Sequence, residues 1–387
     1  MAINITNLVN AINAKSATIG TGVDSALDKA VSLAGEVKNA SIYSTINDLP
    51  AADSSNSGEI VRLGRSTNAS TKYYISFRDK WKQIGVSDSD VVTGGQFLPF
   101  QGTNFGYTSG STTTIDKFSF ASDGNATNVG VLSLARNRGH AGQSSEVFGY
   151  TSGGYNNGHG SNVIDKFPFA ADGNATDVGN LTQSRSFPAG QSSNEFGYGY
   201  NSGGEYSIGQ YAWNRSNRID KFPFASDANA TIVGGLTRSH RSVTGQSSTV
   251  SGYTSGGGFP GSFNNIDKFP FATDTNATDV GDLTVGRYGT AGQSSTVSGY
   301  NSGGTPTTNR IDKFPFASNA NATTVGDLSL GRYEAAGQSS TASGYTSGGR
   351  SPTTVNNIDK FPFASDGNAT DVGDLTVARF GTAGQQY

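Results

Sequence analysis

A six-fold internal repeat constrains the fold of this chain more than any other feature of the sequence. The string IDKF begins at Ile115, Ile164, Ile219, Ile266, Ile311 and Ile358, at spacings of 49, 55, 47, 45 and 47 residues. A string of the type GYTSG precedes each copy, and AGQ or TGQ follows each copy. A repeat of this length is typical of architectures in which one small structural unit packs against the next copy of itself.

Each repeat unit reads as four short strands. In the sixth unit they cover residues 335–341, 342–348, 357–364 and 369–375, separated by turns rich in Gly, Asn and Asp. In the third of these strands, Ile358 and Lys360 alternate with Asp359 and Phe361, as a strand requires. Strict alternation without a helical segment predicts a blade of a β-propeller rather than a coil of a solenoid.

The two ends of the repeat array predict a closed ring. The first unit lacks the AGQ element before its second strand, and the last unit is followed by AGQQY. Residues 382–387 can therefore supply the inner strand of the blade that residues 104–110 begin. Such closure leaves no free sheet edge, so we expect a mainly β fold with a closed six-bladed propeller.

The units resemble kelch repeats. A diglycine ends the second strand, a hydrophobic-Asp-aromatic sequence forms the third, and an L-x-x-x-R segment leads into the next blade, as at Leu375 and Arg379. The departure lies in the fourth strand, where Val372 stands at the position that is usually Trp in kelch repeats. This difference weakens any transfer of known kelch partners to the chain.

Two shorter regions precede the propeller, which we assign to residues 91–387. Residues 1–40 are expected to form a helical segment for oligomerisation or attachment, and residues 41–90 a small β module. The apolar positions that we expect to make the attachment contacts are Ile5, Leu8, Ile12, Val23, Leu27 and Val31. The alternative is a helix hairpin that packs on its own chain.

Both ends of the chain resemble bacteriophage structural proteins. The order LPAA, GEIVRL and KYYISFRDKWKQIG in residues 49–85 is similar to a short module of phage tail fibres and other virion appendages. The start NLVNAINAK and the repeat array resemble structural proteins of marine phages, especially cyanophages. The resemblance implies a virion appendage that is made in the host cytoplasm. Its N-terminus would join other virion proteins, its propeller would face outward, and fibres of this kind are usually homotrimers.

Composition excludes several other roles. The formal charge of -3 gives no electrostatic basis for nucleic-acid binding, and the absence of Cys removes disulfides and thiolate metal sites. The N-terminus lacks the basic start and apolar stretch of a signal peptide, and no apolar run is long enough for a membrane span. We therefore expect a protein without cofactors or membrane insertion.

The polar residues that recur in every unit are expected to serve the architecture. The turn SDGNATD places Asp366, Asn368 and Asp371 at distances that suggest a calcium site, but blade five has Asn319 and Thr324 at the two carboxylate positions. Turn capping is therefore favoured over a bound metal ion. The repeated Asp and Lys of IDKF are expected to tie adjacent blades together.

Catalysis is not expected. Glycoside hydrolysis needs paired carboxylates, and the variable loops contain one acid, Glu205. The sequence has no sialidase-type Asp box, and copper oxidases of the kelch type need a Cys that it lacks. A depolymerase is therefore the weakest of the functions considered.

The loops between the second and third strands carry nearly all of the length variation between units. In an antiparallel blade these 2–3 loops emerge on the same face as the 4–1 connections between blades. The expected ligand-binding residues of these loops are Tyr155, His159, Tyr206, Tyr211, Trp213, Phe259 and Phe263. Exposed aromatic residues among Asn, Ser and Gly suit recognition of a host glycan or protein. The alternatives are that these aromatics only pack the loops on the ring, and that the protein is a neck, whisker or capsid-surface decoration.

Overall fold

The computed structural model describes residues 41–43, 60–63, 72–77, 80–84, 101–209 and 212–387. Contacts divide the chain into one compact unit at 1–97 and a second at 98–387. The helical segment expected in residues 1–40, with its six contact positions, lies outside the described residues. Within the part of the chain that the structure describes, no helix is long and apolar enough to cross a membrane.

The described residues of the first unit form a four-stranded sheet in the order β1-β2-β3-β4. Its strands are β1 (Ser41–Tyr43), β2 (Ile60–Leu63), β3 (Lys72–Phe77) and β4 (Lys80–Ile84). The pair β1 and β2 is parallel, and the other two pairs are antiparallel.

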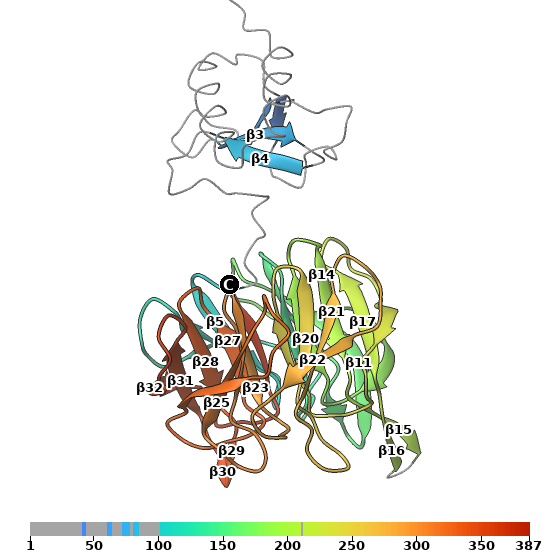
Figure 1. Cartoon of the computed structure of the whole chain (residues 1–387), viewed down its shortest axis with the longest axis vertical. Coiled ribbons are helices and arrows are strands. Elements are labelled where there is room, and N and C mark those ends of the chain that lie inside the picture. The colour runs from blue at the N-terminus through green and yellow to red at the C-terminus, as the bar shows by residue number, and fades with distance from the viewer. Residues whose placement is uncertain (1–40, 44–59, 64–71, 78–79, 85–100, 210–211) are drawn as a thin grey trace, which may run out of the picture. The chain divides into compact units, whose positions relative to one another are not determined.

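The second unit is a six-bladed β-propeller, which confirms the predicted fold class (Figure 1). Blade one contains β33 (Ala383–Gln386), β5 (Phe105–Ser109), β6 (Thr114–Ser119) and β7 (Thr127–Val131). Blade two contains β8 (Ala141–Ser144), β9 (Phe148–Ser152), β11 (His159–Pro168) and β12 (Thr176–Arg185), with β10 (Tyr155–Asn156) paired to β11. Blade three contains β13 (Ala189–Ser193), β14 (Tyr198–Ser202), β17 (Arg218–Pro223) and β18 (Thr231–Gly235), with a hairpin of β15 (Glu205–Gly209) and β16 (Ala212–Arg215).

The remaining three blades follow the same order. Blade four contains β19 (Thr244–Ser247), β20 (Ser251–Ser255), β21 (Asn265–Pro270) and β22 (Thr278–Asp282). Blade five contains β23 (Ala291–Ser294), β24 (Ser298–Ser302), β25 (Arg310–Pro315) and β26 (Thr323–Asp327). Blade six contains β27 (Ala336–Ser339), β28 (Ser343–Ser347), β31 (Asn357–Pro362) and β32 (Thr370–Asp374), with a short hairpin of β29 (Arg350–Ser351) and β30 (Thr353–Thr354).

The C-terminal strand closes the ring, as predicted from the ends of the array. β33 pairs antiparallel with β5, and its register places Gln385 opposite Tyr107. The carbonyl of Tyr387 accepts hydrogen bonds from the amides of Asn104 and Phe105. Blade one is therefore built from both ends of the propeller unit.

The apolar core consists of six clusters, one between each pair of adjacent blades. In the cluster between blades one and two, Tyr107, Ile115 and Leu132 pack on Phe167 and Phe169 of the next blade. Both faces of a blade are thus covered, so Ile and Phe of IDKF are buried although their side chains alternate. The repeat is apolar on both faces because each blade packs against two neighbours.

The AGQ element holds the inner strands together around a central channel. Each Gln side chain donates a hydrogen bond of 2.8–3.0 Å to the Tyr carbonyl of the following blade. The residue that follows each Gln donates a hydrogen bond from its backbone amide to the side chain of the equivalent residue in the neighbouring inner strand. This set closes on itself through Ser144, Ser192, Ser247, Ser294, Ser339 and Gln386.

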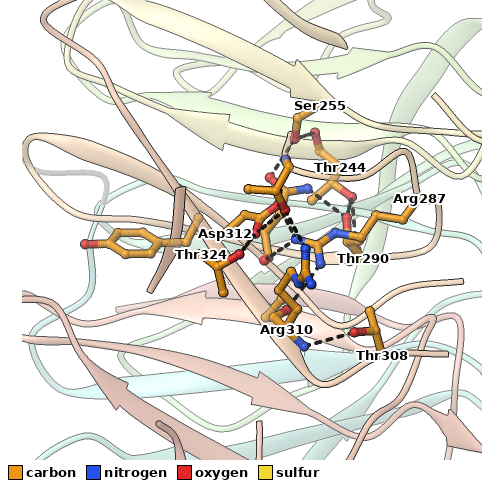
Figure 2. A network of polar contacts seen from close by, with 12 residues as sticks. Thr244, Ser255, Arg287, Thr290, Thr308, Arg310, Asp312 and Thr324 are labelled. Atoms are coloured by element: carbon orange, nitrogen blue, oxygen red, sulfur yellow. Dashed lines mark hydrogen bonds and ion pairs between the residues drawn. The ribbon is translucent and has the colours of Figure 1, made fainter. Parts of the chain in front are cut away.

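The Asp of IDKF forms a buried ion pair at five of the six blade junctions. The pairs are Arg136–Asp165, Arg185–Asp220, Arg287–Asp312, Arg332–Asp359 and Arg379–Asp116. Figure 2 shows the Arg287–Asp312 junction, where Thr324 also donates to the carboxylate of Asp312. At the sixth junction His240 replaces the arginine, and Asp267 accepts hydrogen bonds from Thr237.

The Lys of IDKF and the NAT turn join the blades at their outer strands, as the tying role predicted for this Lys requires. Five of the six lysines form an ion pair with the turn Asp of the next blade: Lys117–Asp172, Lys166–Asp227, Lys221–Asp274, Lys313–Asp366 and Lys360–Asp123. For the sixth lysine, Lys268, the turn of the next blade has Asn319 in place of this Asp. The Asn of each NAT string accepts a hydrogen bond from a backbone amide of the preceding blade's fourth strand. Asn368 and its equivalents therefore join neighbouring blades, whereas Asp371 accepts a hydrogen bond from the amide of Gly373 in its own strand, as turn capping predicts.

Candidate functional site

The 2–3 loops and the 4–1 connections lie on one face of the ring, as the blade topology predicted. Isolated bridges join them within a blade: Arg138 with Tyr155, Ser186 with Glu205, Arg241 with Gly258, Tyr288 with Thr305 and Tyr333 with Arg350. The hairpins β15–β16 and β29–β30 extend from this face, at the bottom of Figure 1. We call this surface the loop face.

The structure brings Tyr155 and Trp213 together from two different blades. Their ring centroids lie 5.8 Å apart, and the guanidinium of Arg138 lies 5.4 Å from the centroid of Tyr155. The hydroxyl of Tyr206 accepts a hydrogen bond of 3.1 Å from Asn214 within the β15–β16 hairpin. The predicted residue Tyr211 lies outside the described residues.

The other predicted residues have different surroundings. His159 is exposed at the start of β11. Phe259 is 39% exposed, and the guanidinium of Arg241 lies 4.0 Å from its ring centroid. Phe263 is half-buried with its ring 5.8 Å from that of His240. Phe263 therefore packs the loop on the ring, whereas Phe259 presents its ring to solvent.

Sequence reasoning missed a row of arginines that alternate with these aromatic rings. Arg138 lies between Tyr155 and Phe187, at 5.4 and 5.5 Å from their centroids. Arg241 lies between Phe187 and Phe259, at 5.6 and 4.0 Å. We call this series the arginine–aromatic ladder. It crosses blades two, three and four, and cation–π contacts of this kind hold each guanidinium in place.

The ladder borders the mouth of the central channel, where six residues form a closed ring of backbone hydrogen bonds. Each amide donates to the carbonyl of the equivalent residue in the preceding blade, at 2.6–3.0 Å. The members of this mouth ring are Gly139, Phe187, Ser242, Gly289, Glu334 and Gly381. The same residues line a cavity at the mouth together with Pro188, Val243 and Thr382.

All six residues of the mouth ring have positive φ. The angle is 64–71° at the three glycines, and 56°, 54° and 54° at Phe187, Ser242 and Glu334. A residue with a Cβ is strained in this region, at a cost of about 1–3 kcal/mol. Three side chains are therefore kept at positions where the other blades use glycine. Comparing the residues that follow the L-x-x-x-R arginine between units would have indicated them, because these residues differ from blade to blade.

One carboxyl group lies among three arginines at this mouth. Burial raises the pKa of Glu334, and Arg138, Arg241 and Arg350 act against this increase electrostatically. Arg241 also forms an ion pair of 2.6 Å with the buried Glu205. Within the described residues, neither Arg138 nor Arg350 forms an ion pair with a carboxylate. Among these residues no group of His, Asp and Glu is arranged to hold a metal ion.

Two buried histidines make stability depend on pH. Burial lowers the pKa of His140 to about 3 and that of His240 to about 4. The unfolded chain therefore binds more protons below its His pKa of about 6.5. Stability is fully present above pH 6.5 and is lost as pH falls through 4, by about 3 kcal/mol for His240 alone.

We expect His240→Met to flatten the fall in stability between pH 7 and pH 4.5, measured by urea unfolding at both values. His159→Gln is the control, since His159 is exposed and its replacement should keep the slope of the wild type. The raised pKa of Glu334 makes its own contribution to stability increase as pH falls. The pH dependence of each variant is therefore compared with that of the wild type. Equal slopes for His240→Met and the wild type would contradict the prediction.

No protein-family model and no curated protein matches this chain. The fold and the chemistry of the loop face therefore provide the evidence for a binding role.

Proposed function

We propose that this chain is a bacteriophage virion protein, a tail fibre or related appendage, whose propeller binds a host surface receptor without catalysis. The observation that carries the receptor role is the concentration of variable loops, aromatic rings and arginines on one face. The strands and the turns of the opposite face repeat from blade to blade, since each blade must pack against two neighbours. Recognition of a particular partner is possible where the units differ.

The virion role is supported by sequence resemblance. The module in residues 49–85 and the repeat array are similar to phage structural proteins, and this similarity suggests attachment of residues 1–40 to other virion proteins. A homotrimer is the assembly typical of such fibres. Under this proposal the protein resides in the phage particle.

The carboxylates on the loop face support binding over hydrolysis. Glycosidases need two carboxyl groups about 5–10 Å apart in separate acid and nucleophile or base roles. Of the two glutamates in the described loops of this face, Glu205 is paired with Arg241. Glu334 is then left as a single carboxyl beside arginines.

A structural decoration of the particle is the second candidate. It is favoured by contacts within the loops themselves, such as the pairing of Tyr155 with Trp213 and of Tyr206 with Asn214. In that role the loop face would pack against neighbouring virion proteins and would not contact the host.

Binding to cells tests the receptor role. Labelled full-length protein is mixed with a panel of cyanobacterial and other marine bacterial strains, and bound label is measured by flow cytometry. We expect Trp213→Ala to lower binding to a recognised strain about ten-fold, because Trp213 is half-exposed on a hairpin outside the six sheets. The free energy of unfolding of this variant should equal that of the wild type.

Val297→Ala is the matched control, since Val297 is 65% exposed in a turn of the opposite face. It should bind as the wild type does. Absence of binding to every strain, with the protein packed among other subunits in the particle, would favour the decoration role. Equal binding by Trp213→Ala and the wild type would remove Trp213 from the site.

A further inference from the structure

We infer that the mouth of the propeller binds an anionic saccharide, with a carboxylate or phosphate group held by Arg138 and Arg350 and sugar rings lying against Tyr155 and Phe259 of the ladder. This inference rests on the proposed receptor role and specifies its ligand class. It requires cations that are available at the mouth, a charge field that favours anions there, and side chains kept for binding.

Two arginines of the loop face are available for an anion, one in the connection into blade two and one in the β29–β30 hairpin of blade six. Arg138 and Arg350 are exposed, and each guanidinium lies over an aromatic ring, with Arg350 at 5.6 Å from Phe380. The Arg350 Nε donates to the carbonyl of Pro352, which further fixes its side chain. A guanidinium ordered in this way retains N–H groups for a planar anion, and such charge-assisted bonds are stronger than neutral ones.

The connections on the two faces have opposite charge. Apart from the buried pairs, those of the loop face carry five arginines and two glutamates, a sum of five minus two, or +3. The arginines are Arg138, Arg215, Arg238, Arg241 and Arg350. The opposite connections carry seven acids: Asp123, Glu146, Asp172, Glu195, Asp227, Asp274 and Asp366. The five Asp among them pair with lysines of the adjacent third strands, so the sum on this face is five minus seven, or -2. In a chain of net charge -3, this asymmetry attracts anions to the loop face specifically.

Two of the three strained residues of the mouth ring, Phe187 and Glu334, interact with the arginines. Phe187 separates Arg138 from Arg241, and Glu334 lies within the electrostatic influence of both and of Arg350. Glycine would relieve the strain at both positions, as it does at Gly139, Gly289 and Gly381. Residues retained in strained conformations are concentrated at functional sites.

Replacing Glu334 tests the inference through the direction of the change in affinity. Without ligand its carboxyl group interacts electrostatically with Arg138 and Arg350, and an incoming anion must compete with it. Glu334→Gln keeps the shape of the side chain and removes this competition. It should therefore increase affinity for an anion, whereas a merely structural role would predict a loss or no change.

The experiment measures binding of the full chain to immobilised polygalacturonate, dextran phosphate and neutral dextran by biolayer interferometry. We expect binding to at least one of the two anionic polymers, a decrease with added salt, and none to dextran. The double variant Arg138→Gln with Arg350→Gln should bind at least ten-fold more weakly, and Glu334→Gln about three-fold more tightly. The polymer that is bound distinguishes a carboxylate from a phosphate ligand.

Lys268→Gln is the control for loss of positive charge, because Lys268 forms no ion pair in the described part of the chain and lies on a strand away from the mouth. A loss as large as that of the double arginine variant would overturn the inference, as would equal binding to neutral dextran. If cells are bound but neither anionic polymer is, or if protease treatment of the cells abolishes binding, the saccharide inference fails and the receptor role stands. If a polymer is bound in the expected manner but no cell strain is, the receptor role fails and the mouth site stands.

Discussion

Removing residues 383–387 is expected to abolish the cooperative folding of the propeller. The deletion takes away β33, so β5 loses its inner partner and becomes a free sheet edge. It also removes Gln385, which donates to the carbonyl of Tyr150 in blade two, and Tyr387, whose ring stacks on Phe169 at 5.3 Å. Together these contacts exceed the margin of about 5–15 kcal/mol by which domains are stable.

The measurement is thermal unfolding by circular dichroism together with size-exclusion chromatography. The truncated chain should lose its sharp transition and elute as aggregates, since an unpaired edge strand is a site for association. Gln386→Ser is the control, because it restores the Ser of the other blades and keeps the backbone pairing of β33. A truncated chain that unfolds at the wild-type temperature would show that ring closure is not needed for stability.

Most of the propeller could be predicted from the sequence because its six units can be compared with one another. Six copies of IDKF gave the number of blades, and the AGQQY end gave the closing strand. Comparison among units also favoured capping over metal binding, because a change such as Asn319 at a turn position is harmless to a cap and damaging to a metal site. The loop face followed from antiparallel topology alone, since strand direction determines where each connection emerges.

Contacts between blades could not be derived from the pattern within one blade. The alternation in IDKF suggests one buried and one exposed face, yet Ile358 and Phe361 are both buried, in different inter-blade clusters. The buried pairing of Arg185 with Asp220 joins residues 35 positions apart in adjacent units, and periodicity does not show which unit supplies the partner. The mouth ring was missed for the same reason, because only the closed ring brings Phe187 and Glu334 to one opening.

The candidate site was predicted in part. Loop length pointed to Tyr155 and Trp213, which the structure places in contact, and to Phe259. It did not point to Arg138 or Arg241, which lie in 4–1 connections of nearly constant length. A comparison of loop lengths reveals inserted residues. It does not reveal Arg138 and Arg241, because they differ from the equivalent residues of other blades in side chain and not in loop length.

The inner strands supply the second large expected effect. Gly245→Ala should destabilise the propeller by more than about 3 kcal/mol, the upper end of the usual cost of overpacking a core. A Cβ on Gly245 would lie 2.0 Å from the carbonyl oxygen of Gly190 in the adjacent inner strand. That atom belongs to the backbone, and all six inner strands make the same close approach, so relief at one junction would shift the others.

Gly367→Ala is the matched control, because a Cβ at Gly367 meets nothing within 4 Å. Replacing a glycine by alanine normally stabilises a protein by about 0.4–1 kcal/mol where the backbone permits it, since the unfolded chain loses freedom. The two substitutions are chemically identical. If urea unfolding shows a lower free energy of unfolding for Gly245→Ala and a higher one for Gly367→Ala, the destabilisation arises from crowding between the inner strands that line the channel. Equal effects would contradict a ring of inner strands in contact through their glycines, and the diameter of the channel would then have to be larger than the hydrogen bonds of Gln191 and Gln246 to the next blades allow.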